Sequence, residues 1–440
     1  MEENDLRATI TEVAGPNIDR LRQYATGGIA FGAAMVGVGF AFGGLPTIFQ
    51  SWLFAWMFWL GVTSGSMAFL MLHHAVGGGW GYVLRRFLEA ATTPRVWLTV
   101  LAMGLVAFIP PLFLKMPVLY AAPGGWAHPD AASNLVIQAK EMWLNPVAFM
   151  VRLAIYFAVW TVWSTQLHTL GRVEDEREDA GVFKRLNYLG AGGIVMYVLT
   201  TTFAVVDFVM SLEPTWFSSI IGLLFVAAQA LSTLALMLVL VWVLGENRPI
   251  FDPERMRHLK MPAYFRDLGN LMLATTMLWA YTSFSQYLIT YSGNTLEEVG
   301  WYVHRNRGGW WILSSALVFL HFFFPFLVLL LGSKVKRTPS RLAQIAGFII
   351  FMRFVDLLYW VVPTFRESIT MLSPSDLGAP VLLGGIWLHQ WVAGLSGKSL
   401  VPLHASRVVE HLAHEHERPD APGHSHAPGT GHGSEAPANV

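Results

Sequence analysis

The sequence contains no cysteine and unusually few charged residues. Only 13% of its 440 residues are Asp, Glu, Lys or Arg, whereas soluble domains carry roughly 25%. The absence of cysteine excludes disulfide bonds, thiolate-held iron–sulfur clusters, covalently attached c-type haem and a thiol nucleophile within this chain. The formal net charge is zero, so the composition gives no indication of a nucleic-acid partner.

Hydrophobic residues make up 54% of the chain and occur in long uninterrupted runs. A run of about 20 residues spans the roughly 30 Å hydrocarbon core of a bilayer as a helix. Ten helices buried in a soluble protein would leave no polar face for water, and a β-barrel would show short alternating segments. The sequence therefore predicts an all-α polytopic membrane protein with about ten transmembrane helices. Their expected ranges are 25–42, 47–72, 96–114, 146–168, 188–212, 216–244, 268–291, 309–332, 342–363 and 379–396.

The basic residues predict the orientation of these helices. The N-terminal segment, the loops after the second, fourth, sixth and eighth helices, and the C-terminal tail together hold 22 of the 29 Lys and Arg residues. The opposite loops hold five. Because basic loops stay on the cytoplasmic side, we expect both termini in the cytoplasm and the protein in a bacterial inner membrane.

Three regions follow from this pattern. Residues 1–24 form a polar cytoplasmic segment without the apolar region and cleavage site of a signal peptide, 25–396 form the membrane domain, and 397–440 form a cytoplasmic tail. From about residue 404 the tail is rich in His, Gly and Pro, and we expect it to be disordered. Its histidines suit a transition metal, but no neighbouring ligands fix a geometry, so a solvated tail is the favoured interpretation.

Several ionisable or polar residues lie inside the predicted spans. Such groups are costly in a membrane and often mark function; they are Arg152, Asp207, His321, Arg353, Asp356, His389 and a stripe formed by Thr282, Ser283, Ser285, Gln286 and Tyr287. Each also has a structural interpretation: Arg353 and Asp356 are three residues apart and can pair with each other. As a set, they predict a proton path or the polar end of a quinone pocket.

Haem is not expected in this chain. A b-type haem in a helical bundle needs two histidines that face each other at one depth. His73 or His74 could meet His168, but the spans carry no repeated histidine pairs. A phosphate-binding loop is not expected either, because Gly77–Gly79 lacks the Lys and Ser/Thr that complete that motif.

Two motifs carry a resemblance to a known family. The first is DFVMSLEPTWFSS, from Asp207 to Ser219; the second is SFSQYLITYSGN, from Ser283 to Asn294, followed by EEVGWY (297–302) and RGGW (307–310). They resemble the polysulfide-reductase-like (NrfD-type) membrane subunits of alternative complex III. The match is closest to the second large membrane subunit, the ActF-like one.

The resemblance implies two four-helix bundles, helices 2–5 and 6–9, with helices 1 and 10 at their flanks. It implies a complex with an iron–sulfur subunit, a multihaem cytochrome c and a paralogous membrane subunit, which oxidises quinol (menaquinol or ubiquinol) and passes electrons to cytochrome c or an oxidase. Asp207 and Glu213 would be signature carboxylates, and Ser283, Gln286 and Tyr287 belong to the second motif. This chain itself would hold no redox cofactor.

The leading hypothesis is therefore a subunit that hosts quinol or moves protons. Asp207, His321, Arg353 and Asp356 would carry protons, while Gln286 and Tyr287 orient a quinone ring or water. A proton- or ion-coupled transporter is an alternative, because Pro110–Pro111 and Pro325 interrupt two helices as in some transporters. A scaffold subunit is a further alternative.

Overall fold

The computed structural model describes residues 3–176, 180–245 and 261–395, and these are almost entirely helical. No strand occurs among the described residues. Helix is the expected form for long apolar segments in a membrane, because it satisfies every backbone N–H and C=O within one segment. The predicted all-α fold class is confirmed, whereas the His-rich tail after residue 396 lies outside the described residues.

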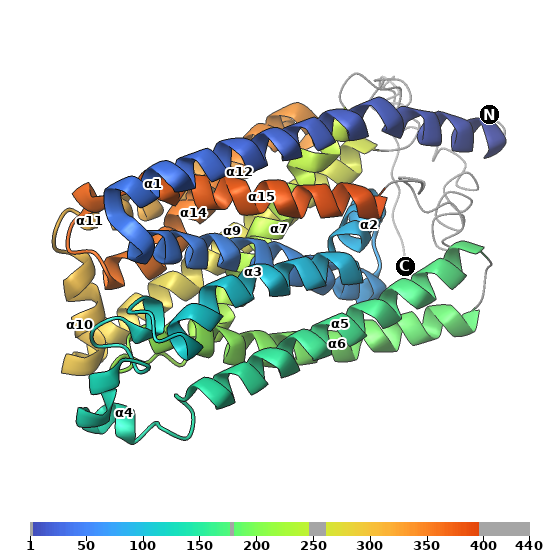
Figure 1. Cartoon of the computed structure of the whole chain (residues 1–440). Helices are drawn as coiled ribbons and strands as arrows, with labels where there is room; N and C mark the ends of the chain where they lie inside the picture. The colour runs from blue at the N-terminus through green and yellow to red at the C-terminus, as the bar shows by residue number, and fades with distance from the viewer. Residues whose placement is uncertain (1–2, 177–179, 246–260, 396–440) are drawn as a thin grey trace, which may run out of the picture.

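The first helical stretch, α1, consists of two arms that run in opposite directions (Figure 1). It begins at Glu3 and ends at Val76, and the helix is interrupted at Gly44, which has φ 64° and ψ −166°. Only glycine adopts this backbone conformation without strain, since it has no Cβ. The reversal at Gly44 turns the second arm back along the bundle, and α15 contacts both arms (Figure 1).

The remaining helices follow in chain order. The long helices are α3 (Pro94–Phe113), α5 (Pro146–Glu176), α6 (Ala180–Phe208), α7 (Ile221–Gly245), α9 (Met261–Gly293), α14 (Pro339–Val361) and α15 (Pro374–Leu395). The eighth predicted span consists of α11 (Trp311–Ala316), the π-helix η5 (Leu317–Phe323) and α12 (Phe324–Leu331). Shorter helices are α2 (Gly79–Ala91), α4 (Leu135–Gln138), α10 (Leu296–Arg305) and α13 (Ser333–Arg337). Single 3₁₀ turns are η1 (Leu119–Ala121), η2 (Pro129–Ser133), η3 (Met210–Leu212), η6 (Val362–Thr364) and η7 (Ile369–Met371).

Seven helical stretches of the described chain are long and apolar enough to cross a membrane. The first of them, Asn17–Val76, contains both arms of α1. Helices α9 and α15 are more polar, but with 33 and 22 residues they also run along the bundle (Figure 1). With these two and the second arm of α1, the structure accounts for the ten predicted spans.

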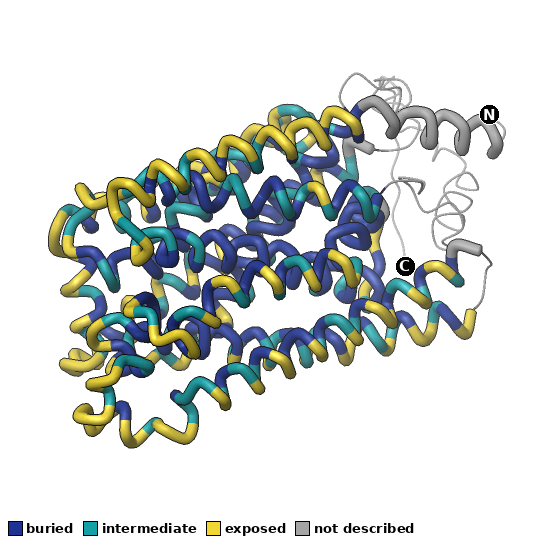
Figure 2. Tube along the Cα trace, viewed as in Figure 1, coloured by how far each residue is buried: buried dark blue, intermediate teal, exposed yellow. Residues whose placement is uncertain are grey.

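The long helices form two four-helix groups. In the first bundle, the second arm of α1, α3, α5 and α6 contact one another around a ring; in the second bundle, α7, α9, α11–η5–α12 and α14 do the same. The bundles meet along α7, most of which is buried, whereas the outer faces of α5 and α6 are exposed (Figure 2). This arrangement confirms the predicted two-bundle organisation.

The first arm of α1 packs against α15, outside both bundles. The two backbones approach closely: a Cβ added to Gly32 would overlap the backbone nitrogen of Leu382, and one added to Gly385 would lie 2.6 Å from the carbonyl oxygen of Ala25. Small residues at such crossings drive helix association in membranes, where burial from water contributes little. Close contacts at glycines therefore hold the first arm of α1 against α15.

The connection between the fifth and sixth spans is longer than the predicted three-residue turn Glu213–Thr215. Helix α6 ends at Phe208 and α7 begins only at Ile221, with the turn η3 between them. The two helices nevertheless contact each other, as an antiparallel hairpin requires. The additional residues bring polar side chains of this connection to the mouth of the second bundle, as described below.

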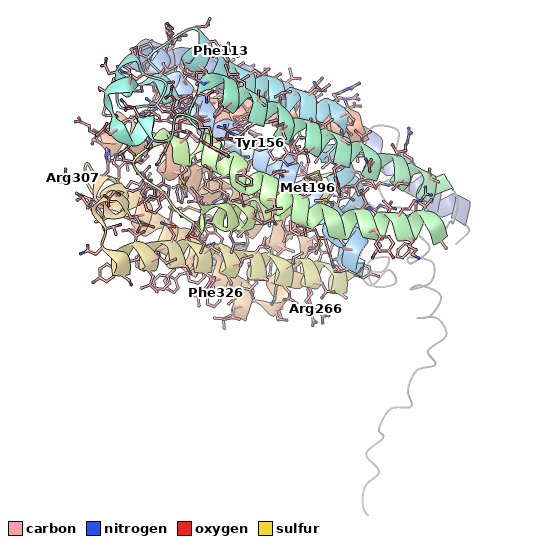
Figure 3. All side chains as sticks on the ribbon, turned by 90° about the horizontal axis from the view of Figure 1, so that it is seen from below. Phe113, Tyr156, Met196, Arg266, Arg307 and Phe326 are labelled. Atoms are coloured by element: carbon pink, nitrogen blue, oxygen red, sulfur yellow. The ribbon has the colours of Figure 1, made fainter. Side chains whose placement is uncertain are left out.

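Two arginines mark the two ends of the bundle. Arg266 and Arg307 lie at opposite ends (Figure 3). The end with Arg266 is here called the basic end. The start of α1, the end of α5 and the start of α6 also lie there (Figure 1). The opposite end holds the reversal at Gly44 and the short helices α4, α10 and α11.

Candidate functional site

A buried histidine lies in the middle of the second bundle. His321 is at the midpoint of the Trp311–Leu331 span and its side chain is fully buried. Neither ring nitrogen has a hydrogen-bond partner among the described residues. Its imidazole meets the indole of Trp279 edge to face, with ring centroids 4.2 Å apart. Because buried polar groups in proteins nearly always have a partner, this histidine needs an explanation beyond packing.

The same indole also contacts an ion pair. Trp279 Nε1 donates to Asp356 Oδ2 at 3.1 Å, and the guanidinium of Arg353 donates to the same oxygen. Arg353 Nε also donates to Ser232 Oγ at 3.1 Å. The four side chains and His321 come from α7, α9, η5 and α14, so every helix of the second bundle contributes to this central cluster.

Local sequence explains how these helices present their polar groups inward. Arg353 and Asp356 are three residues apart on α14, which places both on the buried face. His321 lies in a π-helical turn, and the next helix carries Pro325 near its start. Proline removes a backbone donor and disturbs the regular ladder, and π-turns occur frequently at functional sites.

The polar stripe of α9 continues from this cluster toward the end opposite the basic end. Thr282, Gln286 and Thr290 are buried, and Gln286 Nε2 donates to Thr290 Oγ1 at 3.2 Å. Gln286 also accepts a hydrogen bond from Ser218, in the long connection before α7. The predicted site residue Ser283 is half-buried, whereas Tyr287 is 46% exposed. The stripe is therefore split into an inner face with Gln286 and an outer face with Tyr287.

Tyr287 belongs to an aromatic group on the outside of the second bundle. Its ring stacks on Tyr291 with centroids 6.0 Å apart and meets Tyr302 edge to face at 5.4 Å. Tyrosines at the end of a transmembrane helix commonly mark the membrane interface. The structure thus places Tyr287 away from the central cluster.

Glu213 binds a buried arginine at the mouth of the second bundle. Arg305 Nη1 donates to Glu213 Oε1 at 2.9 Å, and Thr364 Oγ1 donates to the same oxygen at 2.7 Å. Arg305 also donates to the carbonyl oxygens of Tyr359 and Trp360 on α14. The Glu213 side chain is 23% exposed, so it connects the surface to the helix that carries Asp356. Burial lowers the pKa of Arg305, and the carboxylate of Glu213 acts in the opposite direction.

Asp207 lies in the first bundle, apart from the central cluster. Its carboxylate accepts from Trp143 Nε1 at 2.9 Å, from Arg152 Nε at 2.9 Å and Nη2 at 2.8 Å, and from the Tyr156 hydroxyl at 2.8 Å. Arg152 in turn lies over the Trp143 ring, 4.0 Å from its centroid. Four donors hold this carboxylate, so the geometry is that of a fixed, charge-compensated anion.

The structure therefore divides the predicted site residues among several places. It brings together His321, Arg353 and Asp356, and it places Gln286 and Glu213 between them and the opposite end of the bundle. His389 is exposed on α15. Sequence reasoning did not identify Trp279, Ser232 or Arg305 as partners, because contacts between distant helices leave no local pattern.

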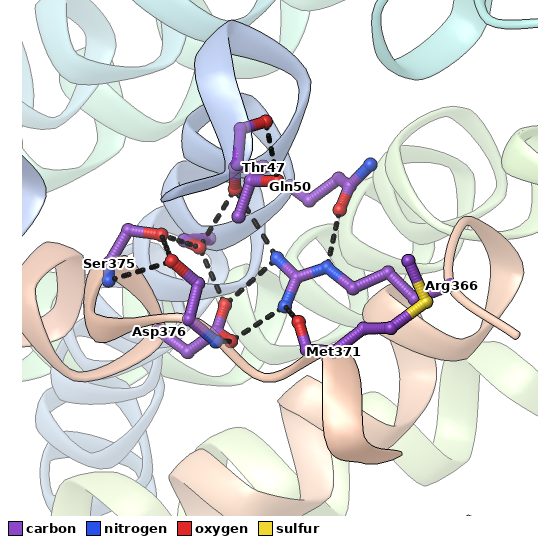
Figure 4. Close-up of polar contacts among 9 residues, drawn as sticks. Thr47, Gln50, Arg366, Met371, Ser375 and Asp376 are labelled. Atoms are coloured by element: carbon purple, nitrogen blue, oxygen red, sulfur yellow. Dashed lines mark hydrogen bonds and ion pairs between the residues drawn. The ribbon is translucent and has the colours of Figure 1, made fainter. Parts of the chain in front are cut away.

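A second buried ion pair was also missed by sequence reasoning. Arg366 forms a bidentate pair with Asp376, at 2.7 and 3.1 Å, and donates to Gln50 Oε1 at 2.7 Å and to the Met371 carbonyl (Figure 4). Ser51 Oγ donates to Asp376 at 2.6 Å. The network joins the turn before α15 to the second arm of α1, just after the reversal at Gly44. Its donors and acceptors are paired, as expected for a structural contact.

An apolar cleft of about 530 Å³ lies between α1, α7, α14 and α15. Phe54, Trp59, Phe354 and many aliphatic side chains line it, and Ser373 and Asp376 are its polar groups. Asp376 is already paired with Arg366. The size and lining suit a single lipid-like chain, because ligand pockets of this kind have volumes of roughly 300–1,000 Å³.

The basic end contains a buried ionic network around α2. Arg85 donates to Glu89 at 2.9 Å and to Glu174 on α5 at 2.6 Å, and Arg86 donates to Glu89 at 2.7 Å. Burial alone would raise the pKa of Glu89, but the two arginines outweigh burial and hold this pKa well below its usual range. Because the pKa is depressed, Glu89 stabilises the fold at pH values above its unfolded pKa. That contribution is lost as the pH falls through the folded pKa.

Replacement of Glu89 by Gln tests this network. We expect the free energy of unfolding at pH 7 to fall by about 3 kcal/mol, because two buried arginines lose a counter-ion. Unfolding of the purified protein in detergent measures the change, and the difference from wild type should shrink at acidic pH. Glu141→Gln is the control, because Glu141 is exposed. Equal stability of Glu89→Gln and wild type would contradict a stabilising role.

No described group of three or more His, Asp or Glu side chains is arranged to hold a metal ion. The histidines considered for haem have other neighbours. His168 Nε2 lies 3.1 Å from Thr92 Oγ1, and His73 and His74 are adjacent on α1 with ring centroids 5.8 Å apart.

Comparison with known proteins gives no further constraint. No protein-family model matches the chain, and no curated protein matches it.

Proposed function

We propose that this protein is a membrane subunit of a respiratory quinol:cytochrome c oxidoreductase, and that its second bundle carries protons. The observation that carries the proposal is His321, a fully buried imidazole without a hydrogen-bond partner among the described residues, beside the Trp279–Asp356–Arg353 cluster. The two motifs that resemble NrfD-type subunits support the type of complex. They include Glu213, Ser218 and Gln286, and Ser218 donates a hydrogen bond to Gln286.

In this proposal the central cluster holds and releases a proton. Asp356 accepts hydrogen bonds from Arg353 and Trp279, so its carboxylate is held beside the indole that His321 contacts. His321 can take up or release a proton through either nitrogen, and water supplied during turnover would satisfy these nitrogens. Gln286 and Ser218 would orient water between the cluster and Glu213 at the surface. Electrons would remain on the haem and iron–sulfur centres of partner subunits.

The family resemblance and the distribution of basic residues give the proposed partners and orientation in the membrane. The partners would be a paralogous membrane subunit, an iron–sulfur subunit and a multihaem cytochrome c. The basic end would face the cytoplasm of a bacterium, because basic residues concentrate in its loops. Protons would then move between the middle of the inner membrane and the opposite, outer surface.

A second candidate role is quinol binding, and the apolar cleft favours it. The cleft could receive an isoprenoid tail, and Ser373 at its polar end could donate to a quinone carbonyl. None of the sequence-predicted site residues lines this cleft. Proton conduction is therefore the function that the geometry supports best.

Replacement of His321 by Phe tests the proposal. Phe keeps the ring in its packed place but carries no proton, so we expect proton movement by the intact complex to fall about a hundredfold, in line with the loss of a positioned acid–base group. The measurement is acidification outside vesicles during quinol oxidation. Phe322→Leu, on the same turn, is the control.

Purification separates this proposal from its alternatives. A respiratory subunit should bring haem-containing partners, whereas a transporter should be isolated alone. A scaffold subunit would bring the partners but would retain full proton movement after His321→Phe. Either of the latter two results would contradict the proposed function.

A further inference from the structure

A second cleft opens between α5 and α6 close to their basic ends. Its volume is about 620 Å³, and its lining includes Trp163, Gln166, Thr169, Arg185 and Tyr188. Most of these side chains are on the exposed outer face of the first bundle. They lie where the apolar spans end, because 146–168 and 188–212 are the apolar parts of these two helices. The cleft is therefore at the level of lipid headgroups.

Three side chains around this cleft have donors that no described residue uses. Arg185, Gln166 and Tyr188 make no hydrogen bond or ion pair with any described residue. By contrast, the Trp163 indole nitrogen is engaged with the carbonyl oxygen of Leu189 at 3.1 Å. An arginine at the depth of the lipid headgroups, with no counter-ion among the described residues, can attract an anionic group. The unpaired donors therefore indicate an anionic ligand with several acceptor oxygens.

Neighbouring residues add positive charge and an apolar wall. The Lys184 ammonium lies 6.0 Å from the centroid of the Tyr188 ring, and Arg172 is exposed one turn beyond Thr169 on α5. The nearest described carboxylate of α5, Glu174, is buried and already paired with Arg85. Leu170 and Leu189 continue the lining toward the apolar parts of the helices. The cleft thus combines a cationic rim with an apolar floor.

We propose that this cleft binds the headgroup of one anionic phospholipid. The phosphate would accept from the Arg185 guanidinium, the Gln166 amide and the Tyr188 hydroxyl, and its acyl chains would lie along α5 and α6. Basic clefts between transmembrane helices at the cytoplasmic surface bind such headgroups, whose charge is worth about 1 kcal/mol per Lys or Arg. The interaction is independent of proton movement in the second bundle.

Native mass spectrometry of the full chain in detergent tests the proposal with phosphatidylglycerol as the probe. Wild type should bind one phosphatidylglycerol more tightly than phosphatidylcholine. Arg185→Gln should bind it about fivefold more weakly, which corresponds to the roughly 1 kcal/mol of one lost charge. Arg341→Gln is the matched control, because Arg341 is also exposed and lies at the start of α14, outside the cleft. It should bind like wild type.

Three results would overturn the proposal. They are equal binding by Arg185→Gln and wild type, equal affinity for phosphatidylcholine, and displacement of the lipid by millimolar inorganic phosphate, which would indicate a site for a soluble anion. A photoactivatable phosphatidylglycerol in native membranes provides a second measurement. It should label residues 163–170 or 185–189, and complete protection of these segments by a partner subunit would also contradict a lipid site.

Discussion

Replacement of Asp356 by Asn should reduce proton movement by the intact complex about a hundredfold while quinol oxidation continues more slowly. Asn preserves the size of the side chain and can still accept from Trp279, but it cannot take up a proton or balance the charge of Arg353. The expected magnitude is that of losing a positioned acid–base group. Acidification measured together with cytochrome c reduction in vesicles gives the two rates separately.

The same change is expected to destabilise the second bundle. Arg353 would remain buried without a counter-ion, which costs about 3–5 kcal/mol. A loss of activity could therefore reflect misfolding, so a matched variant is needed. The double replacement Arg353→Met with Asp356→Leu removes both charges, and such exchanges are often neutral for stability.

The two variants together separate chemistry from folding. We expect the double variant to unfold like wild type and still to lack proton movement. Ser232→Ala is a further control, since it removes one partner of Arg353 and leaves the carboxylate in place. Normal proton movement in a stable double variant would remove Asp356 from the mechanism.

Replacement of Asp207 by Asn should lower the free energy of unfolding by about 3–5 kcal/mol. Asp207 is 1% exposed and receives four hydrogen bonds, two of them from the Arg152 guanidinium. An Asn amide group would turn one acceptor into a donor and leave Arg152 without its counter-ion. Unfolding in detergent, monitored by circular dichroism, measures the effect.

Graded controls test whether the charge or the hydrogen bonds dominate. Asp130→Asn should be neutral, because the Asp130 side chain is 87% exposed. Tyr156→Phe removes one donor to Asp207 and should cost about 1 kcal/mol. If Asp207→Asn instead keeps full stability but loses proton release, Asp207 belongs to the proton path, as the sequence alone suggested.

The comparison of Asp207 with Asp356 shows why sequence could not assign their roles. Both are acidic residues within apolar spans, and both have the same role, as proton carriers, in the prediction from sequence. Asp207 is enclosed by donors from α5 and the connection before it. Asp356 instead shares one indole with His321, whose ring nitrogens have no hydrogen-bond partner in the part of the chain that the structure describes. Arg152 is 55 residues from Asp207 along the chain, and Trp279 is 77 residues from Asp356. No local sequence pattern specifies such contacts.

Other residues also show that the sequence alone does not reveal which side chains face the inside of the bundle. Gln286 and Tyr287 are neighbours in one motif, but successive positions on a helix point in different directions. One is therefore buried near Ser218, and the other faces outward. His389 looked equivalent to His321 as a histidine within an apolar span, yet α15 flanks the bundles and leaves it exposed.

The amino-acid sequence by itself determined the all-α membrane fold and the approximate positions of the spans. It could do so because apolar runs of the length of a bilayer must become helices, whose backbone hydrogen bonds are local. The grouping into two bundles was implied by the family resemblance, not by the apolar pattern. Only the tertiary structure decided which polar side chains meet. Those meetings depend on how helices rotate and cross, which close contacts such as that of Gly32 with α15 and reversals such as that at Gly44 determine.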